Sequence, residues 1–402
     1  MATKTVVFLT DQKTAATSLG IIDTSHHPPE SYSTNEVEVI PPIYPISHQP
    51  TEASLYVTPT CNLSCSYCYI TPFIQEAKTP RDTPKLLTTE QWISIIHELY
   101  KNGVRYMKFI GGEPLLRSDL STLIREADQL GVVGIEIATN ATYSVISKKQ
   151  DALDTYQRVK AKTLFSTSLD SVGASYNDSI RGGCDDVKRG ISYLVERGFA
   201  VSVATVITKN NIDAIEDLFS FALESGVSVY QFGTLVPMFK EQKELVILDP
   251  HLLLEVCEKI ASLQKQAGHR MTIVNRMVPG PNLKPHIYRM YQDVPYISES
   301  SLSGCPAGTR EVYVLPDGRI VACPMFIQKP EWYSSESLIN TPFSKLWMED
   351  RGITEFRSMV ATPDLHGDCC SCEFGKSCKG GCRAMTYFNR DSFEEKDPRC
   401  LF

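Results

Sequence analysis

The sequence predicts an α/β protein in which a partial (β/α)6 barrel of the TIM type is followed by a small cysteine-rich domain. Between residues 54 and 268, six apolar strand candidates alternate with six helix candidates. Such alternation favours parallel strands with helices packed outside them, and six units indicate an incomplete barrel. After about residue 290 the alternation ends and Gly, Pro and Cys become frequent. Periodicity alone leaves a doubly wound sheet as the structural alternative.

Each element of the barrel has its own signal. The strand candidates are rich in β-branched and aromatic residues; they are SLYVTP (54–59), VRYMKFIGG (104–112), GIEIATN (134–140), KTLFSTSLD (162–170), AVSVATVIT (200–208) and VSVYQFGTLVP (227–237). The helix candidates have polar starts and several Gly stops; they cover 89–103, 117–131, 146–158, 184–198, 212–226 and 249–268.

These elements divide the chain into three parts. Residues 1–52 are rich in Ser, Thr, Pro and His and predict an irregular arm with short strands at 5–9 and 36–40. Residues 53–290 form the predicted barrel, and residues 291–402 the second domain. A hairpin is expected over 310–323, around Asp317-Gly318.

Composition excludes several classes of function. Forty basic residues against 47 acidic ones, without a basic run, give no sign of nucleic-acid binding. The apolar runs are too short for a membrane span or a signal peptide, so we expect no membrane and a cytoplasmic protein. Thirteen cysteines without a secretory signal favour metal binding over disulfides.

Three cysteines follow the first predicted strand directly. Cys61, Cys65 and Cys68 have the spacing C-x3-C-x2-C. Three thiolates suit a [4Fe–4S] cluster with one iron that lacks a protein ligand, and an open position is typical of catalytic sites. A zinc site with a distant fourth ligand is the alternative. Because GGEP, TNA and SLD end the next three strands, we expect these segments to meet the cysteines at one mouth.

The cysteine motif, with Tyr67 before its third cysteine, resembles the signature of the radical SAM enzymes. The resemblance implies that the unique iron binds the amino and carboxylate groups of S-adenosylmethionine. One electron then cleaves the sulfonium to methionine and a 5′-deoxyadenosyl radical, which abstracts a hydrogen atom from the substrate.

The same resemblance assigns S-adenosylmethionine contacts. The methionine amino group is expected at the GGEP segment, the carboxylate at Ser168 and Arg181, the ribose at Asn140, and the adenine at Tyr67; the GGEP residues are Gly111, Gly112, Glu113 and Pro114. Taken singly, each of these residues also fits a plain turn, a surface position or core packing.

The C-terminal cysteine spacing resembles a seven-cysteine SPASM domain, which carries auxiliary iron–sulfur clusters. In that family the cluster nearer the barrel would take Cys305, Cys323 and Cys382. The outer cluster would take the remaining four, which are Cys369, Cys372, Cys378 and Cys400. With the first site, this implies three [4Fe–4S] clusters, zinc being the alternative metal. Residues 306–322 contain no cysteine, so the inner cluster is expected to have an open iron or a non-cysteine ligand.

Three further cysteines, Cys184, Cys257 and Cys370, fall outside the pattern. Cysteine is often simply a small buried residue, and this is the interpretation for Cys184 and Cys257. Cys370 could replace Cys369, but Cys369 keeps the x2 spacing to Cys372.

SPASM proteins mostly modify peptides, so the first hypothesis is an oxidoreductase that matures a ribosomal peptide in natural product biosynthesis, for example by oxidative cross-linking. An electron donor such as flavodoxin or ferredoxin is implied. Only about 50 residues precede the first strand, too few for a leader-binding domain, so leader recognition falls to a separate protein or to the arm, or does not occur.

The alternative is radical modification, including sulfur insertion, of a small molecule such as a sugar or nucleoside. A sulfatase maturase is disfavoured because Pro324 follows Cys323 where that group has Asp. A simple electron carrier would not need GGEP. No catalytic base identifies itself; Tyr230, Gln231 and Tyr313 could face the cavity, but a structural role is the simpler interpretation of each.

Overall fold

The computed structural model describes residues 4–7, 20–23, 49–70, 86–277, 305–361, 367–372 and 378–400. Its centre is a curved sheet with the strand order β11-β10-β3-β4-β5-β6-β7-β8-β9. The parallel strands are β3 (Glu52–Thr58), β4 (Tyr106–Gly111), β5 (Gly134–Ala138), β6 (Lys162–Ser168), β7 (Ala200–Ile207), β8 (Val229–Thr234) and β9 (Thr272–Arg276). The partial barrel is thus confirmed, with β9 as a seventh strand that the sequence did not predict.

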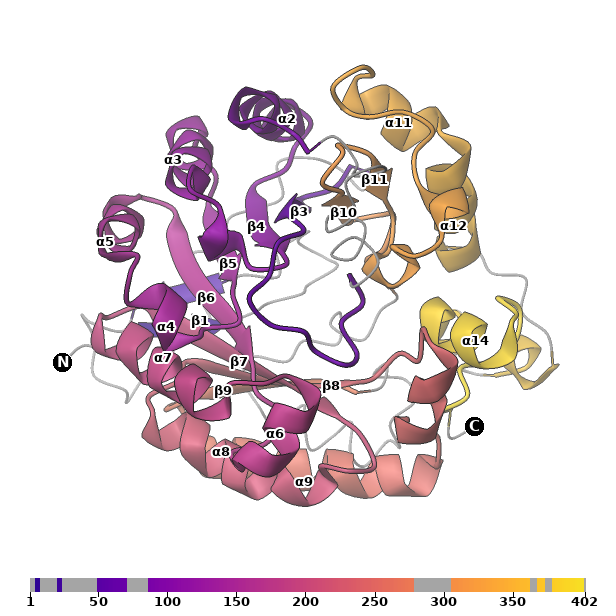
Figure 1. Cartoon of the computed structure of the whole chain (residues 1–402). Helices are drawn as coiled ribbons and strands as arrows, with labels where there is room; N and C mark the ends of the chain where they lie inside the picture. The colour runs from indigo at the N-terminus through magenta and orange to yellow at the C-terminus, as the bar shows by residue number, and fades with distance from the viewer. Residues whose placement is uncertain are drawn as a thin grey trace.

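Helices cover the outer side of this sheet, as Figure 1 shows. They are α2 (Thr89–Lys101), α3 (Leu120–Leu130), α5 (Gln150–Arg158), α7 (Cys184–Glu196), α8 (Ile215–Glu224) and α9 (Pro250–Ala267), with the short α4 (Tyr143–Ile146) and α6 (Ala174–Ile180) near the strand ends. Their apolar faces and the outward residues of the strands share one large core, which includes the fully buried Trp92 and Phe109. None of the helices in the described part of the chain combines the length and apolarity that crossing a membrane requires.

The inside of the barrel is closed at one end by apolar residues. Tyr106, Leu164, Ala200 and Val229 form a small buried cluster of their own. Because side chains alternate across a strand, the residues two positions further along each strand face the same interior, nearer the carboxyl ends. These four apolar residues therefore form the base of a cavity, and the cavity opens at the carboxyl ends of the strands.

The C-terminal domain continues the barrel sheet. Strand β10 (Glu311–Val314) pairs parallel to β3, and β11 (Ile320–Val321) pairs antiparallel to β10. The predicted hairpin is confirmed, and Gly318 has the positive φ of +83° that its turn requires. Beyond it lie α11 (Phe343–Glu349), α12 (Arg351–Ala361) and α14 (Arg383–Arg390), at the right of Figure 1.

The described part of the N-terminal arm includes two short strands. In the arm, β1 (Lys4–Val7) pairs antiparallel with β2 (Gly20–Asp23). β1 overlaps the strand predicted at 5–9, whereas β2 was not predicted and the candidate at 36–40 lies outside the described residues. The predicted boundary at 290/291 also lies outside them, so it stays a prediction.

Candidate active site

The first three cysteines lie in the loop that follows β3, at the mouth of the barrel. All three line a cavity of about 680 Å³. Burial raises the pKa of the Cys61 and Cys65 thiols, and each is raised further by a neighbouring thiol, Cys65 for Cys61 and Cys68 for Cys65. The structure thus brings the three sulfur atoms together, as the sequence predicted.

The GGEP segment packs directly against this loop. Gly112 N donates to Thr58 O at 2.8 Å, and Glu113 N donates to Thr60 O at 2.7 Å. A Cβ atom at Gly111 would lie 2.2 Å from Thr58 O, and one at Gly112 equally close to Thr60 O. Only glycines permit this approach, so Gly111 and Gly112 fix the cysteine loop against the end of β4.

The Glu113 side chain points into the protein and does not line the cavity. Its fully buried carboxylate accepts hydrogen bonds from Thr139 Oγ1 at 2.9 Å, Asn140 N at 2.7 Å and Leu115 N at 3.0 Å. Burial raises its pKa to about 7 despite these donors. Glu113 therefore ties the end of β4 to the end of β5, and Pro114, also buried, starts the 3-10 turn Pro114–Leu116 behind it.

Asn140 occupies the position between the cysteine loop and β5. Its Nδ2 donates to Asn62 Oδ1 at 2.7 Å and lies 3.9 Å from Cys61 Sγ. Its Oδ1 accepts from Thr142 N at 3.1 Å. Asn140 lines the cavity, where the sequence placed it.

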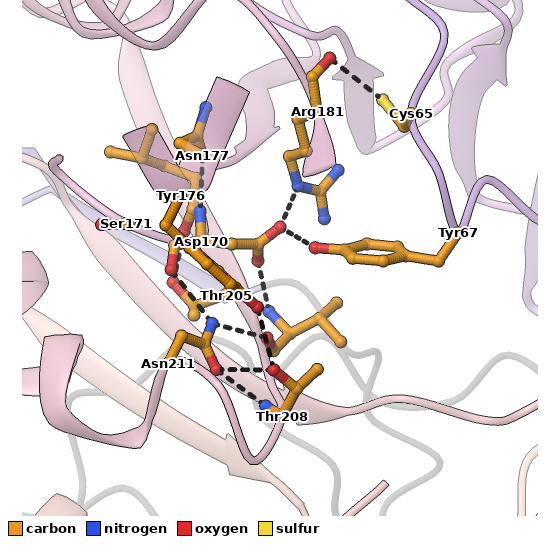
Figure 2. Close-up of polar contacts among 12 residues, drawn as sticks. Cys65, Tyr67, Asp170, Ser171, Tyr176, Asn177, Arg181, Thr205, Thr208 and Asn211 are labelled. Carbon is orange, nitrogen blue, oxygen red and sulfur yellow. Dashed lines mark hydrogen bonds and ion pairs between the residues drawn. The ribbon is translucent and has the colours of Figure 1, made fainter. Parts of the chain in front are cut away.

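Asp170 is the centre of the polar network in Figure 2. Its fully buried carboxylate accepts hydrogen bonds from Tyr67 Oη, from Arg181 Nε and, at 2.8 Å, from Val206 N. The Arg181 carbonyl in turn accepts from Cys65 Sγ at 3.7 Å. Asp170 therefore holds the arginine and the aromatic residue of the cysteine motif in fixed positions. The sequence analysis missed it, although the SLD triplet contains it.

Five of the predicted S-adenosylmethionine residues line the cavity; they are Gly111, Gly112, Asn140, Ser168 and Arg181. Tyr67 is 7% exposed, outside the lining, with its ring near the Arg181 guanidinium, 5.2 Å from the ring centroid. The other three predicted residues are buried and lie outside the cavity lining; they are Tyr67, Glu113 and Pro114.

The barrel interior adds polar residues that the sequence analysis did not select. Lys108 on β4 and Glu136 on β5 form an ion pair at 2.5 Å, and both line the cavity with Gln231 on β8. Of the three residues named from sequence, Gln231 faces the cavity. Tyr230 is buried and bonds to Thr205 Oγ1 at 2.8 Å, and Tyr313 bonds to Glu311.

The inner C-terminal thiols also lie together. Burial raises the pKa of Cys305 to about 12 and that of Cys323 well above its usual range, and Cys382 raises both further. These thiols contact an apolar cluster around Phe326, whose ring lies 5.1 Å from that of Phe356.

The outer thiols form a separate group. Burial raises the pKa of Cys369, with contributions from Cys400 and Cys372, and raises that of Cys378 to about 11. Cys370 is exposed, whereas Cys184 and Cys257 are buried in helices α7 and α9.

A buried ion pair fixes the C-terminal thiols. Asp397 accepts from Cys382 N at 2.9 Å, and its own carbonyl accepts from Cys400 N at 2.9 Å. Arg399 pairs with Asp397 at 2.6 Å and donates to Met277 O at the end of the barrel. Burial opposes ionisation of Asp397, but Arg399 keeps its pKa below the usual value. Asp397 thus connects the inner group through its carboxylate to the outer group through its backbone carbonyl.

Two tyrosines, the buried Tyr56 and the half-buried Tyr69, lie between the first cysteine group and the inner one. Tyr56 Oη and Tyr69 Oη are 3.0 Å apart, and their rings meet edge to face. Burial raises the pKa of Tyr69 to about 12, and the Cys68 and Cys323 thiols add to it. The mouth of the barrel and the C-terminal domain are therefore in contact through these rings.

Comparison with protein-family models decides the family. Residues 55–222 match the model of the radical SAM superfamily, and residues 305–373 match that of an iron–sulfur cluster-binding domain, SPASM. The chain is a radical SAM enzyme with a SPASM domain. Such domains indicate iron–sulfur clusters and S-adenosylmethionine binding.

Two relatives illustrate the sequence similarity. The chain is 26% identical over 367 residues to an AdoMet-dependent heme synthase of Methanosarcina barkeri, with 86% of this chain and 95% of that protein covered. It is 26% identical over 354 residues to the mycofactocin maturase MftC of Mycolicibacterium smegmatis, with coverage of 86% and 81%.

Solved structures share the fold of this radical SAM enzyme. Streptococcus suis SuiB bound to its precursor peptide SuiA superposes with a TM-score of 0.69 at 20% identity, covering 89% of this chain and 77% of that one. The anSMEcpe structure with bound AdoMet has a TM-score of 0.65 at 18% identity, covering 87% and 94%.

The residues present fit the cofactors of this family. No group of three or more His, Cys, Asp or Glu side chains among the described residues closes around a single ion. A [4Fe–4S] cube instead takes its thiolates at separate corners, and the first thiol group borders a cavity with backbone and cationic groups suited to an amino acid. Three thiolates at the edge of this cavity fit a [4Fe–4S] cluster that keeps one iron open to a co-substrate.

Proposed function

We propose that this chain is an oxidoreductase that uses S-adenosylmethionine to abstract hydrogen from a ribosomal peptide in a maturation reaction such as oxidative cross-linking. The observation that carries the proposal is the single cavity lined by Cys61, Cys65 and Cys68 at its mouth and by the Lys108–Glu136 pair in its interior. S-adenosylmethionine bound at the thiols and a substrate bound in the interior would then lie in the same cavity.

Three [4Fe–4S] clusters are part of the proposal, held by the first, inner and outer cysteine groups. When bound, the first cluster and S-adenosylmethionine supply the 5′-deoxyadenosyl radical. Arg181, oriented by Asp170, would hold the methionine carboxylate together with Ser168. Gly112 would present backbone to the amino group, and Asn140, fixed by Glu113, would contact the ribose.

The mycofactocin maturase similarity supports a peptide substrate. The similarity to a heme synthase supports the second candidate, radical modification of a small molecule. We further propose a cytoplasmic location, because thiols stay reduced there, and a flavodoxin or ferredoxin as electron donor. A separate leader-binding protein is a further candidate partner.

The test is anaerobic turnover of the reconstituted protein with dithionite and S-adenosylmethionine. The unmutated protein should form 5′-deoxyadenosine, and Cys65→Ala should form none. Cys184→Ala is the matched control and should keep the activity. Iron-free protein after anaerobic purification and reconstitution would contradict the proposal. Mass spectrometry of peptides and of small molecules after turnover decides between the two substrate classes.

A further inference from the structure

Just above its apolar base, the cavity has a layer of charged and polar side chains, which we call the floor. It consists of Lys108, Glu136 and Gln231. Lys108 on β4 and Glu136 on β5 are register partners, so their side chains share the inner face of the sheet. Lys108 lies three residues before Gly111, or on the order of 10 Å deeper in the barrel than the glycine turn. The pair is thus positioned away from the residues proposed to bind S-adenosylmethionine.

The carboxylate of this pair already has its partners. Glu136 accepts from Lys108 Nζ at 2.5 Å and from Ser166, and Arg276 on β9 is a further nearby cation. Its side chain is 11% exposed. Burial opposes ionisation, but Lys108 outweighs it and keeps the pKa of Glu136 below its usual value. Glu136 is therefore a fixed anion with little surface left for a ligand.

The ammonium group is the accessible member. The Lys108 side chain is 33% exposed. Its ammonium group has three N–H donors, and within the described residues it pairs with Glu136. Nearby, Gln231 donates through Nε2 to Ser202 Oγ at 2.7 Å and also lines the cavity. Lys108 is thus the cation that this pair presents to the cavity, and Gln231 adds a second polar group to the same lining.

We infer that this floor binds a carboxylate group of the substrate, with Lys108 as its anchor and Gln231 as a neighbouring hydrogen-bond partner. The inference rests on the proposed function, since it names the substrate class for the same cavity. Glu136 orients Lys108 through their ion pair. A pair that only joined β4 to β5 would not need its cation exposed to the cavity.

Binding of a matched pair of probes tests the inference. N-acetylphenylalanine and N-acetylphenylalaninamide have nearly the same shape and differ in charge. Equilibrium dialysis is run anaerobically on cluster-loaded protein saturated with S-adenosylmethionine, so that the Arg181 site is already filled. We expect the acid to bind about tenfold tighter than the amide, as a charge-assisted hydrogen bond contributes.

Two substitutions should act in opposite directions. Lys108→Met should abolish the preference for the acid, whereas Glu136→Gln removes a competing anion and should strengthen acid binding. Lys160→Met, at an exposed loop position, is the control and should keep the wild-type ratio. Cluster content and thermal unfolding of each variant establish that it is folded.

The inference is overturned if the unmutated protein binds the acid no more tightly than the amide. It is also overturned if the unmutated protein binds neither probe. A preference that persists in Lys108→Met, or equal losses in both variants, would also overturn it. The proposed function is tested apart from this, since formation of 5′-deoxyadenosine by the unmutated protein needs no carboxylate substrate.

Discussion

The first cysteine group and the inner C-terminal group differ in their surroundings, although each consists of three thiols. Cys61, Cys65 and Cys68 border a cavity whose lining includes charged and polar side chains. Cys323 is buried, and with Cys305 it contacts the apolar cluster around Phe326. The first setting admits a polar co-substrate, whereas the second is dominated by apolar side chains. The comparison teaches that the number of thiols alone does not define a site, because two groups of three thiols differ in their access to a cavity.

The largest effects should come from removing single thiols in the two groups. Cys323→Ala should lose about four iron atoms per chain yet still form 5′-deoxyadenosine, whereas Cys65→Ala forms none. Iron analysis and chromatography of the nucleoside measure the two quantities. If Cys323→Ala also formed no 5′-deoxyadenosine, the first and inner cysteine groups would not have separate roles.

The next effect concerns the ion pair that holds the C-terminal thiols. Asp397→Asn leaves Arg399 buried without its partner anion and weakens the acceptor for Cys382 N. We expect a loss of about 3–5 kcal/mol in the free energy of unfolding, since breaking a buried ion pair leaves an uncompensated charge. Chemical denaturation measures it. The exposed pair partner Glu355→Gln, with its Arg351 contact, is the control and should change little.

The two regions should also respond oppositely to pH. The pKa of Glu113 is raised to about 7 in the folded state, so the fold binds more protons than the unfolded chain between about pH 4.5 and 7. Its contribution to stability therefore falls as pH rises through that window, by about 3 kcal/mol at most. Asp397 has a lowered pKa, so its contribution is present above the usual carboxyl pKa and is lost in acid.

Denaturation at pH 5, 6, 7 and 8 measures this contrast. Glu113→Gln should lose the decline between pH 5 and 7 that the unmutated protein shows. An identical pH profile in the variant would mean that Glu113 does not titrate in this range.

The smallest effect should come from aromatic packing beside the inner thiols. Phe326→Leu loses ring contacts with Phe356 and Tyr387 and should cost about 1 kcal/mol in the free energy of unfolding. Formation of 5′-deoxyadenosine should not change, because Phe326 itself does not line the cavity. A loss of that activity would show that the two regions are coupled more tightly than their surroundings indicate.

Much of the fold was predictable from the sequence because its signals are local. Alternating apolar strands and capped helices predicted six barrel strands, and close spacing predicted the group of Cys61, Cys65 and Cys68. The inner and outer groups were implied by the resemblance to SPASM domains. The pairing of β10 with β3 was not predictable, since two strands so far apart in the chain share no local pattern.

The site was predictable where a motif carries it, and less so where partners come from the fold. GGEP identified Glu113, but the donors that turn its carboxylate inward, Thr139 and Asn140, come from another strand. Lys108 and Glu136 did leave a signal. Each is a lone charged residue in an otherwise apolar strand, YMKFIG and GIEIA, and such a residue in a barrel strand tends to face the interior cavity.

The pairing of β10 with β3 has a consequence for synthesis. On the ribosome, β3 is among the first barrel segments to emerge, and β10 is among the last. Until β10 arrives, the outer edge of β3 presents free backbone donors and acceptors to any other extended chain. A nascent chain that stalls before residue 311 is therefore expected to aggregate through this edge.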